Sequence, residues 1–176
     1  MKITEVLVAE HAIFLGVFAQ IERALPGCAT LPEVRVLAGI VEGLLRPHAE
    51  TESNLAYAAL DQALAERGSL DRLYQDHHEI DAGLKNVSRA RTCAEARQLL
   101  EASLRATREH FRYEERNVFP LLEQWLQGES LAELGRVWLQ QRTEGVKSLE
   151  TVERDLREED GSPKIEGRKK SEVRGP

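Results

Sequence analysis

Two short segments of the sequence combine a histidine with a glutamate four residues later. The first is HAETE, which spans His48 and Glu52, and the second is HFRYE, which spans His110 and Glu114. Residues four apart lie on the same face of a helix. Imidazole nitrogens and carboxylate oxygens suit iron, manganese and zinc, so each segment offers two neighbouring metal ligands if its shared face is buried.

Apolar residues recur at spacings of three and four through most of the chain, and strand-like alternation is absent, which predicts helices nearly everywhere. The apolar stripes of four predicted helices each contain one histidine, and two of them also contain a glutamate. The stripe residues are Leu7, His11, Phe14, Phe18, Ile21 and Leu25 in the first helix, Val41, Leu45, His48, Glu52, Leu55 and Ala59 in the second, Leu70, Leu73 or Tyr74, His77, Ile80 or Asp81 and Leu84 in the third, and Leu100, Leu104, Thr107, His110, Glu114, Val118 and Leu121 in the fourth.

A single histidine in an apolar stripe is usually a hydrogen-bonded core residue. A glutamate there is rarer, because an unpaired buried carboxylate costs several kcal/mol or becomes neutral. Four histidines and two glutamates in one bundle core would be very costly without a cation. The stripes therefore predict a metal centre formed by His11, His48, Glu52, His77, His110 and Glu114.

The chain also contains a weak internal repeat. AEHAIF around His11 resembles DHHEI around His77, and PHAETESNLAYAAL around His48 resembles EHFRYEERNVFPLL around His110. Two similar helical hairpins would place the first two histidines opposite the second two, with the two glutamates between them. This arrangement predicts a pseudo-symmetric pocket for two metal ions, in which each carboxylate can bridge.

The order of these elements resembles the hemerythrin-like family, also called the HHE cation-binding domain. Its pattern is H, then HxxxE, then H, then HxxxE, and the sequence matches it with His11, His48 to Glu52, His77 and His110 to Glu114. The proline before His48 and the VFP after the second HxxxE also resemble that family, over roughly residues 3–125. The resemblance implies a four-helix bundle holding a non-haem di-iron centre that meets dioxygen, peroxide or nitric oxide.

Two of the ligand assignments have a neighbouring alternative. His78 follows His77 and points about 100° away around a helix, so we favour a supporting or surface position for it. Glu115 is five residues after His110, a spacing that some family members use for their carboxylate, and it stays an alternative to Glu114. Tyr74 and Asp81 flank His77 on its face and could offer an oxygen ligand, although core packing and solvation are favoured for them. Trp125 and Trp138 are expected to be packing anchors for the last helix rather than parts of the site.

Breaks in the periodicity divide the chain into five helices. The first is predicted from about residue 2 to Leu25, and the second from Leu31 to Gly68 with a kink at Pro47. The third runs from an N-cap at Ser69 to Ala90, and the fourth from an N-cap at Thr92 to Gly128 with a bend at Pro120. The fifth runs from Ser130 to a point within 150–157. Short connections favour antiparallel neighbours. We expect an all-α protein: an antiparallel up-down four-helix bundle over 1–127, a C-terminal helix over 128–156 packed on or extending the bundle, and a disordered charged tail over 157–176.

Bulk properties exclude several partners. The net charge is −6 and the pI is near 5.5, which argues against nucleic acid. No uninterrupted run approaches the ~18 apolar residues of a membrane span, and the N-terminus lacks a signal-peptide pattern, so we expect a cytoplasmic protein without a membrane partner. Cys28 and Cys93 lie far apart and have no CxxC partner, which indicates reduced thiols.

Charge and ligand type favour iron as the cofactor. The two glutamates contribute a charge of −2, so a site with two divalent ions has a net charge of about +2, which bridging hydroxide or bound anions can offset. A bridging oxide gives the diferric state a similar net charge. Two oxo- or hydroxo-bridged non-haem iron ions are therefore predicted, with manganese or zinc as alternatives.

The ligand count also bears on function. Oxygen-carrying hemerythrins use five histidines, with extra ligands on the third helix that saturate one iron. Four histidines and two glutamates would leave both ions with open or water-filled positions, as reactive sites have. We expect binding or reaction with dioxygen, peroxide or nitric oxide, in sensing or stress response rather than oxygen carriage. The alternatives are an iron-responsive regulatory module without turnover, with a protein partner on the C-terminal helix or tail, and a metal-free helical scaffold.

Overall fold

The computed structural model describes the backbone of residues 1–64 and 70–159 and the side chains of residues 1–64 and 70–144. Within these ranges every regular element is a helix, which confirms the prediction of an all-α protein. The chain divides into two compact units, residues 1–139 and residues 140–176. The first unit contains the bundle and all six predicted metal ligands.

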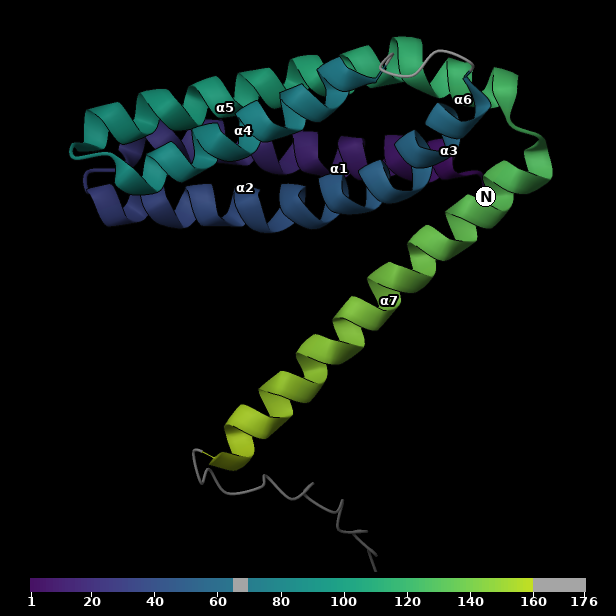
Figure 1. The fold of residues 1–176 in the computed structure, drawn as a ribbon. Coiled ribbons are helices and arrows are strands. Elements are labelled where there is room, and N and C mark those ends of the chain that lie inside the picture. The colour runs from purple at the N-terminus through teal and green to yellow at the C-terminus, as the bar shows by residue number, and fades with distance from the viewer. Residues whose placement is uncertain (65–69, 160–176) are drawn as a thin grey trace, which may run out of the picture. The chain divides into compact units, whose positions relative to one another are not determined.

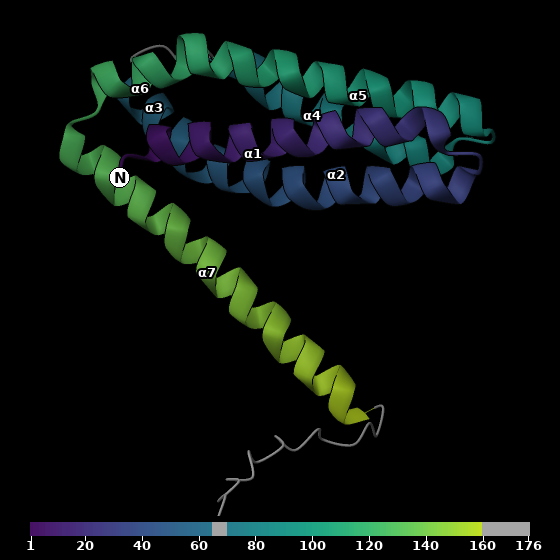
Figure 2. The ribbon, with the colours of Figure 1, turned by 180° about the vertical axis from the view of Figure 1, so that it is seen from behind.

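Four long helices form the bundle: α1 (Ile3–Ala24), α2 (Leu31–Glu52), α4 (Asp71–Arg89) and α5 (Cys93–Tyr113). Consecutive helices run antiparallel, as predicted (Figure 1). Seen from behind, α1 lies between α2 and α5 (Figure 2). Shorter elements complete this unit: the 3-10 turn η1 (Leu25–Gly27), the π-helical segments η2 (Ser53–Tyr57) and η3 (Glu114–Val118), and the short helices α3 (Ala58–Ala63) and α6 (Phe119–Trp125).

Two hydrophobic clusters fill the bundle, and the predicted metal ligands lie between them along each helix. On α1, Leu7 belongs to one cluster and Phe14 to the other, with His11 between them. On α4, His77 likewise lies between Leu73 and Ile80. The polar layer is therefore closed on both sides by apolar packing, which keeps water from most of its atoms.

The π-helical segments explain the one systematic error in the predicted stripes. A π-helical turn contains an extra residue, so the buried stripe moves by one position after each glutamate. The prediction was therefore wrong for Leu55, Ala59 and Leu121, which are partly buried or exposed. The residues buried in their place are Ala56, Tyr57, Leu60, Phe119 and Leu122.

Local signals set several helix boundaries as the sequence predicted. The Thr92 side chain accepts a hydrogen bond from the backbone N–H of Glu95 at 3.1 Å and so caps α5. The predicted N-cap Ser69 lies outside the described residues, but the prediction that the second helix reaches Gly68 was wrong, because the helix ends at Ala63 and Leu64 is extended. Cys28 and Cys93 are free thiols, as predicted.

The last helix, α7, runs from Gly128 to Glu159. It begins before the predicted start at Ser130 and continues past the predicted end within 150–157. The remainder of the predicted tail, 160–176, lies outside the described residues. Within the first unit, Trp138 is fully buried, as expected of a packing anchor, and packs edge-on against the His48 ring at 5.6 Å. The same prediction was wrong for Trp125, which is 52% exposed.

The segment Ile3–Gly27, which comprises α1 and η1, is long and apolar enough to cross a membrane by length and composition alone, and an 18-residue stretch within it has a mean hydropathy of 1.4. The count of uninterrupted apolar residues did not predict this. The core helix of a bundle can have the same length and composition, because the face that it buries is largely apolar. Here that face packs in the two clusters and carries His11.

Two glycines give opposite predictions for stability. Gly39 lies within α2, and a Cβ added there would meet nothing within 4 Å, so Gly39→Ala should stabilise the fold by about 0.5–1 kcal/mol through lower chain entropy. A Cβ at Gly135 would lie 2.5 Å from the carbonyl oxygen of Met1, so Gly135→Ala should destabilise it by about 1–3 kcal/mol. Urea denaturation of both variants measures this, and a stabilising Gly135→Ala would show that α7 does not pack closely on the N-terminus.

Candidate metal centre

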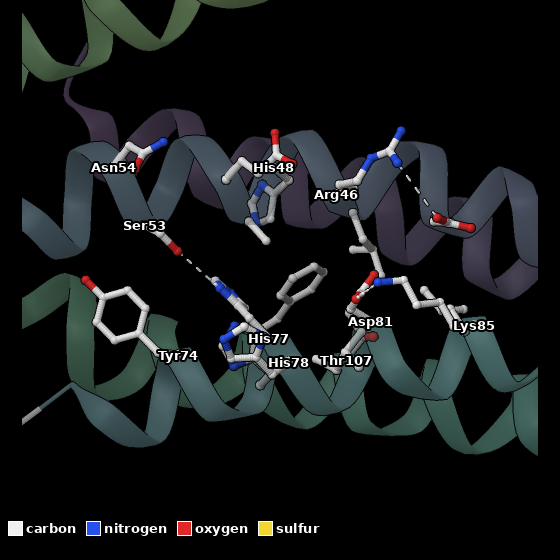
Figure 3. A pocket seen from close by; sticks show the side chains of 18 residues that line it. Arg46, His48, Ser53, Asn54, Tyr74, His77, His78, Asp81, Lys85 and Thr107 are labelled. Carbon is white, nitrogen blue, oxygen red and sulfur yellow. Dashed lines mark hydrogen bonds and ion pairs between the residues drawn. The ribbon is translucent and has the colours of Figure 1, made fainter.

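The six predicted ligands converge at one level of the bundle, between the two hydrophobic clusters. Each of the four long helices contributes one imidazole, as predicted. The side chain of His77 is 14% exposed, and the other five are buried. In Figure 3, His48 on α2 and His77 on α4 lie on opposite walls of a pocket and point toward each other.

The four histidines form two pairs. Nε2 of His11 lies 3.3 Å from Nε2 of His48. The rings of His77 and His110 form the second pair, with centroids 4.6 Å apart. The pairing follows the predicted pseudo-symmetry, because each pair comes from one half of the internal repeat.

Each glutamate reaches one histidine of each pair. The Nε2-to-carboxylate distances are 3.7 Å from His48 to Glu52, 3.5 Å from His77 to Glu52, 3.5 Å from His11 to Glu114 and 3.3 Å from His110 to Glu114. Both carboxylates therefore lie where they can bridge two cations, one at each histidine pair. Two overlapping groups of potential ligands result, namely His11, His48 and Glu52, and Glu52, His77, His110 and Glu114.

An oxygen atom faces the outer nitrogen, Nδ1, of every one of these histidines. The contacts are His11 to Glu115 at 3.0 Å, His48 to Glu10 at 2.9 Å, His110 to Asp76 at 3.4 Å and His77 to the Ser53 hydroxyl at 3.3 Å. Such partners fix the ring orientation and tautomer of metal-binding histidines. A neutral imidazole that donates from Nδ1 has a lone pair on Nε2, and here every Nε2 points inward.

This arrangement calls for a cation. If His11 and His48 both donate to their outer carboxylates, their Nε2 lone pairs face each other across 3.3 Å. Four further buried atoms have no hydrogen-bond partner within the described part of the chain: both Glu52 carboxylate oxygens, Nε2 of His110 and Oε2 of Glu114. Buried polar atoms without partners are costly, and every one of these atoms is a metal donor. The residues therefore fit two cations.

The histidines differ in how readily they accept protons. The pKa of His11 and that of His77 are both lowered to about 3, chiefly by burial; the neighbouring His110 acts in the same direction, and Glu114 opposes it. Burial also acts to lower the pKa of His110, but the carboxylates of Glu114 and Asp76 outweigh it, so that this pKa is raised. His11 and His77 are thus neutral and ready to bind metal at neutral pH.

The two glutamates are shifted in opposite directions. Burial raises the pKa of Glu52 well above its ordinary value, and the nearby Glu114 raises it further. Burial acts in the same sense on Glu114, but His110 and His11 outweigh it and lower the pKa of Glu114. Without a cation, the pair therefore holds one proton and one negative charge, since two adjacent buried carboxylates do not both ionise.

Tyr57 is a central residue that the sequence analysis missed. Its buried hydroxyl donates a hydrogen bond to Glu114 Oε1, and its ring stacks on His77 with centroids 5.5 Å apart. Burial and both glutamates raise its pKa. The repeat aligns Tyr57 with Phe119, whose ring stacks on His11 at 5.7 Å. The sequence does contain a signal for both residues, because each lies five positions after a glutamate of the repeat. The apolar stripe did not include this position, because an uninterrupted α-helix would not bury it.

The neighbouring alternatives lie outside the centre. His78 is exposed on α4, and its side chain turns away from His48 (Figure 3). Glu115 is exposed and contacts the outer nitrogen of His11 rather than the inner one. Two other candidates are also engaged elsewhere: Tyr74 donates to Asp61 at 3.4 Å, and Asp81 pairs with Lys85.

A family model for the hemerythrin HHE cation-binding domain matches residues 2–122, which include all six converging ligands. The chain therefore belongs to the hemerythrin HHE cation-binding family, in agreement with the resemblance of its histidine and glutamate pattern. Comparisons with curated proteins and with solved structures gave no match.

The pKa shifts predict proton release when metal binds. The metal-free protein retains protons on Glu52 and His110 at pH values where the free side chains would lose them, because both pKa values are raised. A divalent metal displaces these protons. Titration calorimetry with Zn²⁺ near pH 6.5, in two buffers of different ionisation enthalpy, should therefore show net proton release. Heats that do not depend on the buffer would contradict the assignment.

Removing the Tyr57 hydroxyl should destabilise the metal-free protein. Tyr57→Phe keeps the ring but leaves Glu114 Oε1 without its donor, which should cost about 1–3 kcal/mol. The loss should be smaller with metal bound, since the metal then satisfies the carboxylate. Tyr74→Phe is the matched control, because that hydroxyl is only partly buried and makes a long contact, and its effect should be under about 0.5 kcal/mol. Equal losses in both variants, by thermal unfolding, would exclude a special role for Tyr57.

Proposed function

We propose that this protein is a non-haem di-iron protein that binds or reacts with dioxygen, peroxide or nitric oxide. The observation that carries the proposal is the pair of shared carboxylates: each glutamate lies within 3.3–3.7 Å of one inward nitrogen from each histidine pair. In this proposal, His11 and His48 hold one iron, His77 and His110 hold the other, and Glu52 and Glu114 bridge them. Bound iron would supply the site for the oxygen or nitrogen ligand.

The outer acids support iron in particular. Glu10, Asp76 and Glu115 add three negative charges to the two of the bridging glutamates, which makes −5 when all five are ionised. The net charge of the site is then −1 with two ferrous ions and +1 with two ferric ions, before any bridging oxide or hydroxide is counted. A site whose residual charge stays near zero in both states can change redox state without burying a large charge.

The third helix of the bundle supports reaction or sensing over reversible oxygen carriage. Helix α4 brings one imidazole, that of His77, to the centre, and the neighbouring His78 is exposed. An ion held by two imidazoles and two bridging oxygens keeps open or water-filled positions, as reactive metal sites do. The proposal also includes a role in sensing or stress response and a cytoplasmic location.

Alanine substitutions at adjacent histidines test the ligand set. Protein reconstituted anaerobically with ferrous iron should hold about two irons per chain, by the two ligand groups. His77→Ala removes an inward donor and should lower the iron content and alter the near-ultraviolet absorption after exposure to air. His78→Ala is the matched control and should leave both unchanged. Iron loss in His78→Ala with a silent His77→Ala would reverse the assignment on α4.

Metal should also contribute strongly to stability. Removing it leaves four buried donor atoms of Glu52, His110 and Glu114 without partners within the described part of the chain, so chelation should lower the free energy of unfolding by several kcal/mol. Thermal unfolding before and after chelation and after reloading measures this contribution. Identical melting temperatures in all three samples would contradict a metal-bound core.

A further inference from the structure

A cavity of about 450 Å³ opens onto the candidate metal centre between α2, α4 and α5. Three of the four central histidines, His48, His77 and His110, line it. Figure 3 shows α2 forming one wall and α4 the other, with His48 and His77 facing each other across the space. The cavity is open to solvent and therefore provides a route from the surface to the second histidine pair.

The cavity is too large for a diatomic ligand alone. A water molecule, comparable in size with dioxygen or nitric oxide, takes about 30 Å³ of liquid volume. The cavity is about fifteen times larger and falls within the range of ~300–1,000 Å³ that is typical of sites for organic molecules. An organic ligand would fill space that small inorganic ligands leave to water.

The floor of the cavity is apolar. It is formed by four buried side chains, Leu45, Ile80, Leu84 and Phe111. The end nearest His77 carries uncharged polar groups, the hydroxyl of Ser53 and the partly buried Tyr74 (Figure 3). The site thus offers apolar contact for the body of a molecule and hydrogen-bonding groups for one end.

The charges on the rim do not favour an anion. The two basic residues that line the cavity are each paired with an acid on the same helix, Arg46 with Glu42 at 3.9 Å and Lys85 with Asp81. Glu50 adds a further negative charge to the lining. A carboxylate ligand would have to break one of these pairs or lie beside an acid, whereas an uncharged molecule would disturb neither.

We propose that this cavity binds an uncharged, largely apolar organic molecule with a hydroxyl or hydroperoxyl end. Its apolar body lies on Leu45, Ile80, Leu84 and Phe111, and its oxygen-bearing end lies beside His77 and Ser53. Binding of a hydroperoxide at the metal rests on the proposed function, because it requires bound iron. Binding of the corresponding alcohol depends only on the cavity.

Titration calorimetry with 2-phenyl-2-propanol tests the proposal on the full-length, metal-loaded protein. The alcohol should bind with a dissociation constant below about 1 mM. Ala49→Trp places a large side chain in the cavity from a partly exposed position on α2, and should weaken binding at least about tenfold. Ala82→Trp is the matched control, because Ala82 is exposed on α4 outside the cavity, and should bind as the unmodified protein does. Should Ala49→Trp not fold, Ala49→Leu makes the same test with a smaller side chain.

Three results would overturn the proposal: no binding of the alcohol, equal weakening in both tryptophan variants, or octanoate binding more tightly than the alcohol. Azide separates this inference from the proposed function, since it is small and needs only an open position on iron. An azide-induced spectral change without alcohol binding would reject the organic ligand and keep the di-iron function. Alcohol binding without any response to azide or hydrogen peroxide would keep the cavity site and reject that function.

Discussion

Two carboxylates and four imidazoles share the interior of a helical bundle, and the cost of removing them from water governs the rest of the structure. Glu52 and Glu114 are fully buried, and burial alone would make both neutral. The surrounding groups are arranged to offset that cost. Outer acids hold three of the imidazoles with their lone pairs inward, and the Tyr57 hydroxyl holds one oxygen of Glu114.

The two halves of the centre are similar but not equivalent. His48 and both histidines of the second pair line the cavity, whereas His11 does not, and His77 is the one of the four that is partly exposed. Carboxylates face the outer nitrogens of three histidines, but the uncharged Ser53 faces that of His77. A carboxylate partner increases the basicity of an imidazole ligand, so we expect His77 to be the weakest donor of the four in the proposed centre. The more accessible of the two proposed metal positions would then also have the less tightly held ligand.

Much of this arrangement could be predicted from the sequence, because helical periodicity and the HxxxE spacing report directly on which side chains share a face. They placed His11, His48 and His110 in the core, and the internal repeat gave the pairing of the histidines. Residues after each glutamate could not be placed in this way. A π-helical turn depends on tertiary packing and has no clear sequence signal, so the burial of Tyr57 and Leu122 was missed. The outer partners were missed for a related reason, since Glu10 and Asp76 reach histidines on other helices.

We propose that four inward imidazoles and two shared carboxylates hold two cations, and anomalous diffraction from crystals loaded anaerobically with ferrous iron would show them. We expect two peaks about 3–4 Å apart, one at the inner nitrogens of His11 and His48 and one at those of His77 and His110, with Glu52 and Glu114 between them. A single peak, or peaks at surface acids with the core side chains unmoved, would contradict it.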